Sequence, residues 1–195
     1  MERVTPLEPP YAPDVAERLA AMMPPGVEPL RLFRVLARNP RILAKIQASN
    51  LLDRGSVERV DRELVILRTC ARCRSEYEWG VHVAIFARRF GFSEDKIAGT
   101  AEWSGSDPRW SAKEGLLVRL ADALYDEAAV EDALWTELRA NFAVDQLLEL
   151  LVLAGFYHTI SFVTNALRID REANADRFPL SAAVATARGA TDSRA

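Results

Sequence analysis

The sequence predicts an all-α fold of eight or nine helices. Apolar residues recur at intervals of three and four, as in Val57, Val60, Leu64, Leu67 and Ala71, which is the spacing of one helix face. No segment combines the apolar alternation of a β-strand with hairpin punctuation. Prolines, glycines and capping residues divide the chain into pieces of helical length. Together these observations favour a multi-helix bundle.

The N-terminal part of the chain contains four expected helices. Prolines at positions 6, 9, 10 and 13 favour an extended arm over residues 1–13. Asp14 is the expected N-cap of a helix over about 14–22, which the following Pro-Pro-Gly ends. Pro29 suits the first turn of a helix over about 29–38, and Asn39-Pro40 begins another that ends before Gly55. The fourth expected helix runs over residues 57–72 and carries the apolar stripe described above.

Five more helices are expected after residue 75. Ser75-x-x-Glu78 has the capping-box pattern and predicts a helix start there, with Gly91 closing the helix after Phe90. Ser93 caps a short helix to about residue 97, and turn residues predict a loop over 103–110. Further helices are expected over about 112–126, 131–141 and 144–167. Residues 14–180 therefore form one expected domain, and the small polar residues 181–195 an expected flexible tail.

Composition excludes several classes of function. The chain has 195 residues, 49% of them hydrophobic, and a formal net charge of −3, so neither a nucleic-acid nor a membrane-surface footprint is expected. The N-terminus lacks the apolar region of a signal peptide. Residues 150–167 contain no Asp, Glu, Lys or Arg, but polar residues such as His158 and Asn165 argue against a membrane span. We expect a cytoplasmic protein in which this segment is a core or subunit-interface helix.

Glu78 and His82 are the first candidates for chemistry. Four residues apart on a helix, they share one face. A carboxylate beside an imidazole can orient the ring and raise its basicity, which is the minimum needed to move a proton. A capping glutamate with a core histidine would give the same pattern, so the residues alone leave both interpretations open.

A longer stretch resembles a known family. Arg62–Leu67, Ser75–His82, Ala87-x-x-x-Gly91 and Ser93–Ile97 are similar to the core of the carboxymuconolactone decarboxylase family, which includes the alkylhydroperoxidase D proteins. The peroxidase branch reads glutamate, eleven residues, then C-x-x-C-x-x-x-H. In that register Glu63 matches the glutamate and His82 the last histidine, while Ser75 and Glu78 occupy the cysteine positions. The histidine between those cysteines falls on Tyr77. The decarboxylase branch has a glutamate four residues before its histidine, as Glu78 and His82 do.

Cys70 and Cys73 form a C-x-x-C pair five residues upstream of the family's position. They would lie at the C-terminal end of a helix, where the helix dipole disfavours a thiolate. They are either a redox pair or packing residues. No second C-x-x-C and no histidine pair completes a zinc site, so neither a metal nor another cofactor is expected.

The resemblance implies an enzyme that performs acid–base chemistry on a small carboxylated or lactone substrate. His82 would be the general acid or base, Glu78 would orient it, and Glu63 would supply a second carboxylate. The expected substrate-binding residues are Tyr77, Arg74 and His158.

Two other functions remain open. One is an alkylhydroperoxidase-like antioxidant reductase that uses Cys70 and Cys73. The other is a non-catalytic helical assembly subunit, in which Glu63, Glu78 and His82 would lie apart or in solvent. The family also implies a homo-oligomer, a trimer or hexamer, for which the uncharged helix would supply apolar surface. A small-molecule substrate is expected, with no nucleic-acid or membrane partner.

Overall fold

The computed structural model describes residues 2–49 and 51–179. This part of the chain contains nine α-helices and no strand, so the prediction of an all-α fold with eight or nine helices is confirmed. The predicted tail, 181–195, lies outside the described residues. The helices are α1 (Pro13–Ala21), α2 (Arg31–Leu36), α3 (Pro40–Ala48), α4 (Arg59–Arg72), α5 (Glu76–His82), α6 (Glu94–Glu102), α7 (Ala112–Glu127), α8 (Asp132–Asn141) and α9 (Val144–Leu167).

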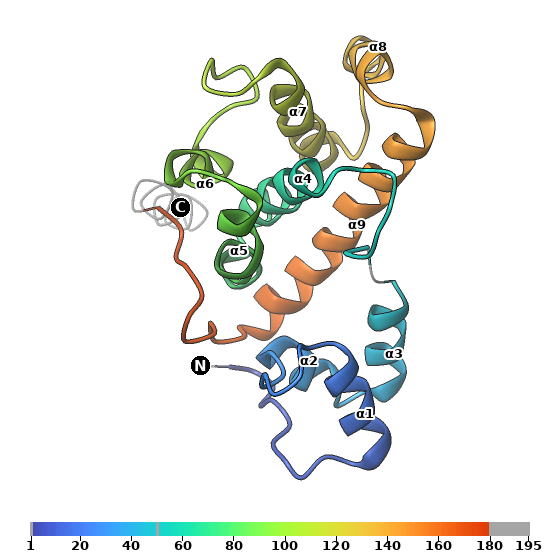
Figure 1. Cartoon of the computed structure of the whole chain (residues 1–195), viewed down its shortest axis with the longest axis vertical. Coiled ribbons are helices and arrows are strands. Elements are labelled where there is room, and N and C mark those ends of the chain that lie inside the picture. Colours follow the sequence, from blue (N-terminus) through green and yellow to red (C-terminus); the bar gives the residue numbers. More distant parts are fainter. Residues whose placement is uncertain (1, 50, 180–195) are drawn as a thin grey trace, which may run out of the picture.

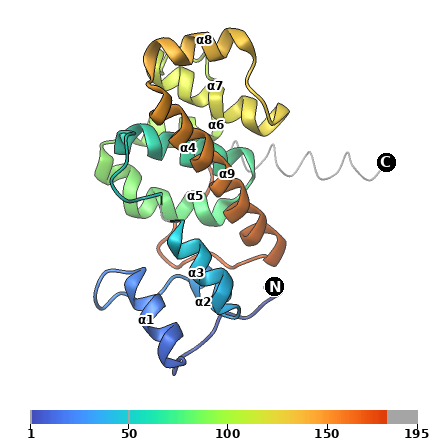
Figure 2. The same cartoon turned by 90° about the vertical axis from the view of Figure 1, so that its right-hand side faces the viewer.

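Helix α4 is the centre of the main core. It packs against α5, α6, α7 and α9, and α9 crosses the molecule diagonally beside it (Figure 1). Ten consecutive residues of α4, from 61 to 70, are buried, because neighbouring helices cover it on several sides. Helices α7 and α8 lie at one end of the molecule and α1 to α3 at the other (Figure 2). A side chain on the inner faces of α4, α5 or α9 is therefore shielded from solvent.

The helices α1 to α3 form a second core around the outer sides of α5 and α9. Val15, Leu32 and Leu43 pack there with Val81 of α5 and Ile160 of α9. Helix α5 thus lies between the two cores, which hold it from both sides.

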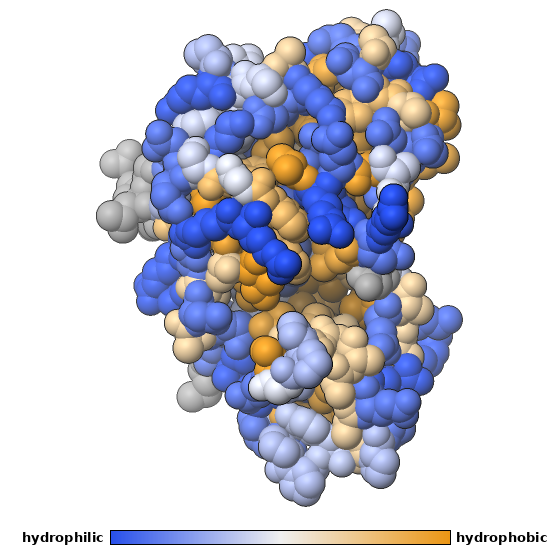
Figure 3. Space-filling view, viewed as in Figure 1, coloured by the Kyte–Doolittle hydropathy of each residue, from blue (hydrophilic) through white to orange (hydrophobic). Residues whose placement is uncertain are grey.

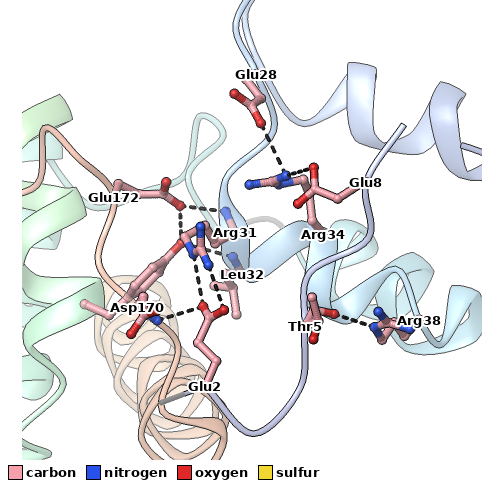
Figure 4. Close-up of polar contacts among 11 residues, drawn as sticks. Glu2, Thr5, Glu8, Glu28, Arg31, Leu32, Arg34, Arg38, Asp170 and Glu172 are labelled. Atoms are coloured by element: carbon pink, nitrogen blue, oxygen red, sulfur yellow. Dashed lines mark hydrogen bonds and ion pairs between the residues drawn. The ribbon is translucent and has the colours of Figure 1, made fainter. Parts of the chain in front are cut away.

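Residues 2–12, before α1, contain no helix or strand, and ion pairs fasten them to the second core (Figure 4). The Glu2 carboxylate accepts hydrogen bonds from the Arg31 guanidinium at 2.7 and 3.0 Å and from the Asp170 backbone N–H at 2.9 Å. Glu8 pairs with Arg34 at 2.8 Å. The N-terminal arm is therefore tied both to α2 and to the segment that follows α9.

Helix α9 is long and apolar enough to cross a membrane by length and composition alone. Its inner face, however, packs on α4 and α5 and contributes Leu147, Leu150 and Leu153 to the main core. This is the behaviour of a core helix, as the polar residues of the segment indicated.

The turn between α4 and α5 places Ser75 differently from the prediction. Arg74 has a φ of 55°, and the Ser75 backbone N–H donates to the Cys70 carbonyl at 2.9 Å. That N–H is unavailable to Glu78, and the Ser75 hydroxyl instead bonds Thr164 Oγ1 of α9 at 2.8 Å. The capping-box prediction at Ser75 and Glu78 is wrong, although the helix start is correct. The Glu78 side chain is thereby left free to reach His82.

The helix that contains His82 widens directly after it. Residues Val83–Ala87 form a π-helical segment, Arg88–Phe90 a 3₁₀ turn, and Gly91 ends the run at a φ of 89°. The predicted end at Gly91 is confirmed. Single π turns inside helices occur frequently at functional sites, and this one lies beside the candidate histidine.

Candidate functional site

Polar side chains from three helices meet in the interior, in a region that we call the polar seam. One inner face each of α4, α5 and α9 contributes, and these helices pack pairwise against one another. The seam is made of Glu63 and Cys70 from α4, Glu78 and His82 from α5, and Tyr157 and Ser161 from α9. All six residues are buried.

His82 lies between two carboxylates. Its Nδ1 is 3.0 and 3.2 Å from the Glu63 carboxylate oxygens, and its Nε2 is 3.5 Å from Glu78 Oε1. The side chains of His82 and Glu63 are 3% and 1% exposed, while Glu78 is 9% exposed. The Glu63 contact has good hydrogen-bond length, whereas the Glu78 contact is longer than the usual 2.7–3.2 Å range. Of these three side chains, Glu78 is therefore the most accessible to solvent, and it lies on the Nε2 side of the His82 ring.

The two carboxylates favour the charged form of His82. Burial by itself lowers the pKa of His82, but the charge and hydrogen bond of Glu63, followed by those of Glu78, outweigh it and raise the pKa to about 10. At neutral pH the ring is an imidazolium with N–H donors at both nitrogens. Glu63 holds the Nδ1 proton, so the Nε2 proton is the one available for chemistry.

Aromatic rings fix the imidazole from two sides. The Tyr157 ring packs edge-on against His82, with 5.1 Å between ring centroids and 86° between planes. Phe86, from the π-helical segment, lies 5.2 Å away and stacks in turn on Phe90. These contacts give His82 a defined orientation, as general acid–base chemistry requires.

The cysteines are held as neutral thiols. Cys70 is fully buried, and burial followed by the charge of Glu78 raises its pKa well above the usual range. Burial also raises the pKa of the half-buried Cys73, with Ser161 and Arg72 partly opposing this. Both cysteines lie at the C-terminal end of α4, the position that the sequence indicated. This environment suppresses the thiolate, which is the reactive form.

The structure brings together Glu63, Glu78 and His82 but not the three expected substrate-binding residues. The Tyr77 hydroxyl donates to Glu172 at 2.6 Å and accepts from the Leu32 backbone N–H at 3.0 Å, in the second core. Arg74 is exposed on the turn before α5. Neither side chain takes part in the polar seam.

His158 lies on a different face of α9 from the seam. Its ring contacts Tyr125 and Phe162, with centroids 5.8 and 6.1 Å away, and burial lowers its pKa. Its sequence neighbour Tyr157 is the residue that faces His82. The sequence could have indicated this, because Ala154, Tyr157, Ser161 and Thr164 follow the buried helical spacing of α9.

Among residues 2–49 and 51–179, no group of three His, Cys, Asp or Glu side chains is arranged to hold a metal ion. A protonated His82 between two carboxylates is suited to proton transfer.

Comparisons with known proteins agree with the resemblance seen in the sequence. Residues 40–123 match the carboxymuconolactone decarboxylase family. The uncharacterized protein YnjA of Escherichia coli (strain K12) is 32% identical over 117 residues, which are 60% of this chain and 63% of that protein. The chain thus spans less than two thirds of this relative.

Solved structures share the fold at low sequence identity. An uncharacterized peroxidase-related protein from Silicibacter sp. TM1040 has a TM-score of 0.75 at 16% identity, over 87% of this chain and 92% of that one. The alkylhydroperoxidase AhpD core of a peroxidase-related protein from Ralstonia eutropha JMP134 has a TM-score of 0.75 at 15% identity, over 89% and 95%. The debrominase Bmp8 has a TM-score of 0.66 at 14% identity, over 88% and 92%. Residues 40–123 are thus similar to the carboxymuconolactone decarboxylase family, and the chain shares its fold with AhpD-like proteins.

Proposed function

We propose that this protein is an enzyme that transfers a proton to a small carboxylated or lactone substrate, with His82 as the general acid. The observation that carries the proposal is the buried Glu63–His82–Glu78 arrangement, with Nδ1 at 3.0 Å from Glu63 and Nε2 at 3.5 Å from Glu78. A non-catalytic subunit was expected to keep these residues apart. Functional sites are where strongly perturbed pKa values gather, and His82 has such a pKa.

Each residue has a distinct part in the proposed reaction. Glu63 fixes the ring through Nδ1 and stabilises the imidazolium. Glu78 makes a long contact to Nε2, so a substrate atom can displace it and accept the proton. In a decarboxylation, the bond to the carboxylate carbon breaks, carbon dioxide leaves, and the electron pair moves into the adjacent carbonyl system. His82 then protonates the resulting enolate, and solvent returns a proton to the ring. The net change is a carboxylate and one proton converted to carbon dioxide and a C–H bond.

The test is turnover of carboxymuconolactone and of acetoacetate, followed as carbon dioxide release. We expect His82→Gln to lose at least about 100-fold in kcat, the range of a general acid–base contribution. Equal rates in the wild type and the variant would exclude His82 as the acid. Because His82→Gln leaves two buried carboxylates without their cation, Glu63→Gln/His82→Gln is the companion variant, and rates are compared only for variants that keep a cooperative thermal transition.

A second candidate function uses Cys70 and Cys73. The observation in its favour is that Cys70 lies in the polar seam, where the charge of Glu78 acts on it. An organic hydroperoxide would be reduced to its alcohol and water while the two thiols form a disulfide, which dithiothreitol would reduce again. The raised pKa values of both thiols argue against it. Hydroperoxide consumption that requires dithiothreitol and is lost in Cys73→Ser would favour this function over the first.

We also infer that the outer face of α9 joins copies of this chain into a homo-oligomer. Four apolar residues spaced along that face, which we call the apolar stripe, are 55–64% exposed: Val144, Leu148, Val152 and Phe162. Apolar surface is visible near the middle of the molecule, where α9 crosses it (Figure 3). No acidic or basic side chain interrupts residues 150–167, which include Val152 and Phe162, so this part of the stripe can pack against a second copy without burying a charge. Asp145 and Glu149 are next to Val144 and Leu148 in the sequence and would lie at the edge of such a contact.

Light scattering after size-exclusion chromatography tests this surface. The wild type should run as a trimer or hexamer, and Leu148→Glu/Phe162→Glu should shift it towards the monomer while its helical circular dichroism is retained. A monomeric wild type, or an unchanged mass in the double variant, would contradict the inference.

A further inference from the structure

The segment that follows α9 returns along the chain's helical core and runs beside α5. Residues 168–179, which we call the strap, contain no helix or strand, and Figure 1 shows them passing from the end of α9 alongside α5. Irregular segments of this kind usually lie on a surface and are more mobile than the helices they follow. The strap is held instead, because Ile169 and Ala175 are buried in the second core.

Hydrogen bonds anchor the first part of the strap to three other segments. The Glu172 carboxylate accepts from the Tyr77 hydroxyl of α5 at 2.6 Å and from the Arg31 backbone N–H at 2.6 Å. The Asp170 backbone N–H donates to Glu2 at 2.9 Å (Figure 4). Hydrogen bonds to a carboxylate are roughly twice as strong as those between neutral groups. The strap is therefore joined to α5, to α2 and to the N-terminal arm.

Asp176 attaches the strap to the helical run on both sides of His82. Its backbone N–H donates to the carbonyl of Gly80, before His82, at 3.3 Å. Its carboxylate accepts from the guanidinium of Arg88, after His82, at 2.8 and 3.0 Å. Between these two attachments lies the π-helical segment, whose Phe86 packs on the imidazole. One residue of the strap thus fixes both flanks of the stretch that carries the candidate histidine.

The strap also approaches the α5 backbone too closely for a side chain to intervene. A Cβ at Gly80 would lie 2.2 Å from the Asp176 carbonyl oxygen, and glycine is the residue that permits such a close backbone approach. Next to this contact, the Phe178 ring packs on Trp79, with 5.2 Å between ring centroids. Trp79 is only 2% exposed. The strap therefore packs directly against the helix.

The strap lies on the side of α5 that faces away from the polar seam. Successive residues of an α-helix are turned by about 100°, so Gly80 and His82 point about 160° apart. Gly80 contacts the strap, whereas His82 Nδ1 lies 3.0 Å from the Glu63 carboxylate of α4. Helix α5 is thus held between the strap and the seam. If the strap were loosened, α5 could move away from α4 and the contact between His82 and Glu63 would lengthen.

We propose that the strap positions His82, with Asp176 as the positioning residue: by holding α5 from behind, it sets the distance between the His82 imidazole and the Glu63 carboxylate. The use of this geometry in catalysis rests on the proposed acid–base function, whereas the geometry itself does not. A strap that only stabilised the fold would lower the Tm when loosened and leave the contact between His82 and Glu63 unchanged.

The test loosens the strap and follows the His82 ring protons by NMR titration. Asp176→Ala removes the strap carboxylate, and Gly80→Ala places a methyl group against the Asp176 carbonyl. Asp176→Glu is the conservative variant, because it restores a carboxylate. The matched control is Asp107→Ala, since Asp107 forms the same kind of paired contact, to Arg109 at 2.6 and 2.8 Å, in the loop before α7.

We expect the pKa of His82, about 10 in the wild type, to fall by about one unit in Gly80→Ala and by less in Asp176→Ala, because the attraction between opposite charges weakens with distance. The kcat for carbon dioxide release from carboxymuconolactone should fall about 10-fold in Gly80→Ala with little change in KM, since a misplacement of about 1 Å can cost about 100-fold in rate. Asp176→Glu should recover part of both losses. Asp107→Ala should match the wild type in pKa and rate.

Two results would overturn the inference. One is an unchanged pKa of His82 in both Gly80→Ala and Asp176→Ala while their Tm falls, and the other is an equal pKa shift in Asp107→Ala. If Gly80→Ala does not fold, Asp176→Ala decides the question alone. Failure of the proposed function gives a different pattern, in which the strap variants lower the pKa of His82 while His82→Gln retains wild-type turnover.

Discussion

Replacing Glu63 by glutamine tests the electrostatic basis of the site. The change keeps the shape of the side chain and an oxygen that can accept from His82 Nδ1, now 3.0 Å from the carboxylate. It removes the negative charge that contributes most to the raised pKa of His82, which stands at about 10 compared with an ordinary 6.5. An opposite charge at such a distance shifts a pKa by about 1–3 units. We therefore expect the pKa of His82 to fall to between about 7 and 9 in Glu63→Gln.

The same change alters how stability depends on pH. A histidine whose pKa is raised by folding stabilises the protein fully below the unfolded pKa, near 6.5, and loses that contribution as the pH rises through about 10. For the wild type the contribution is on the order of 5 kcal/mol, since one pKa unit is about 1.4 kcal/mol. Stability should therefore decrease from pH 7 to pH 10, and the decrease should be smaller in Glu63→Gln.

NMR titration of the histidine ring protons measures this directly. The chain has 2 histidines, and burial lowers the pKa of His158, so only the His82 resonance should move above pH 8. The matched control is Glu76→Gln, the same substitution on α5, the helix that carries His82; the Glu76 carboxylate accepts from the Phe178 backbone N–H instead. A His82 that titrates near 6.5 in the wild type, or that shifts equally in both variants, would refute the ion-pair reasoning.

Two further predictions concern packing and thiol reactivity. A Cβ at position 80 would lie 2.2 Å from the Asp176 carbonyl oxygen, so Gly80→Ala should lower the free energy of unfolding by about 1–3 kcal/mol in urea denaturation. Gly155→Ala, where nothing lies within 4 Å, should be neutral or stabilising; an equal loss in both would contradict the close approach. In thiol titration, Cys70 should react only after unfolding and Cys73 more slowly than free cysteine, because burial raises both pKa values. A fast-reacting native thiol would instead support the peroxidase function.

Helix boundaries were predictable where the signal was local. Asn39 caps α3 by accepting from the Ile42 N–H, and Ser93 caps α6 through the Lys96 N–H, both at 3.3 Å. Such caps depend on the next three residues alone. Asp14 failed as a cap, because α1 begins one residue earlier, at Pro13. Ser75 failed for a tertiary reason, since its hydroxyl bonds a helix 89 residues away.

The candidate site shows the same difference between residues that local spacing predicts and residues that tertiary packing brings together. Glu78 and His82 share a helix, so their spacing places them together. Glu63 is on another helix, and only the family register indicated it. Tyr157 required the packing of α9 on α5, while His158 was favoured because imidazole is a familiar catalytic group. Residue type suggests chemistry, but the inward face of a helix decides which residue can perform it.

The electrostatics of the seam favour acid–base chemistry over thiol chemistry. Two buried carboxylates stabilise a cation, and His82 supplies it. The same charges destabilise any anion nearby, and they raise the pKa of Cys70 together with burial. At the start of α5, where backbone amides could stabilise a thiolate, the chain has Ser75, whose hydroxyl packs α5 against α9. The carboxylates that stabilise the His82 imidazolium therefore destabilise a peroxidatic thiolate in the polar seam. Conversion to a thiol enzyme would require moving the cysteines to the start of α5 and removing the charge of Glu78.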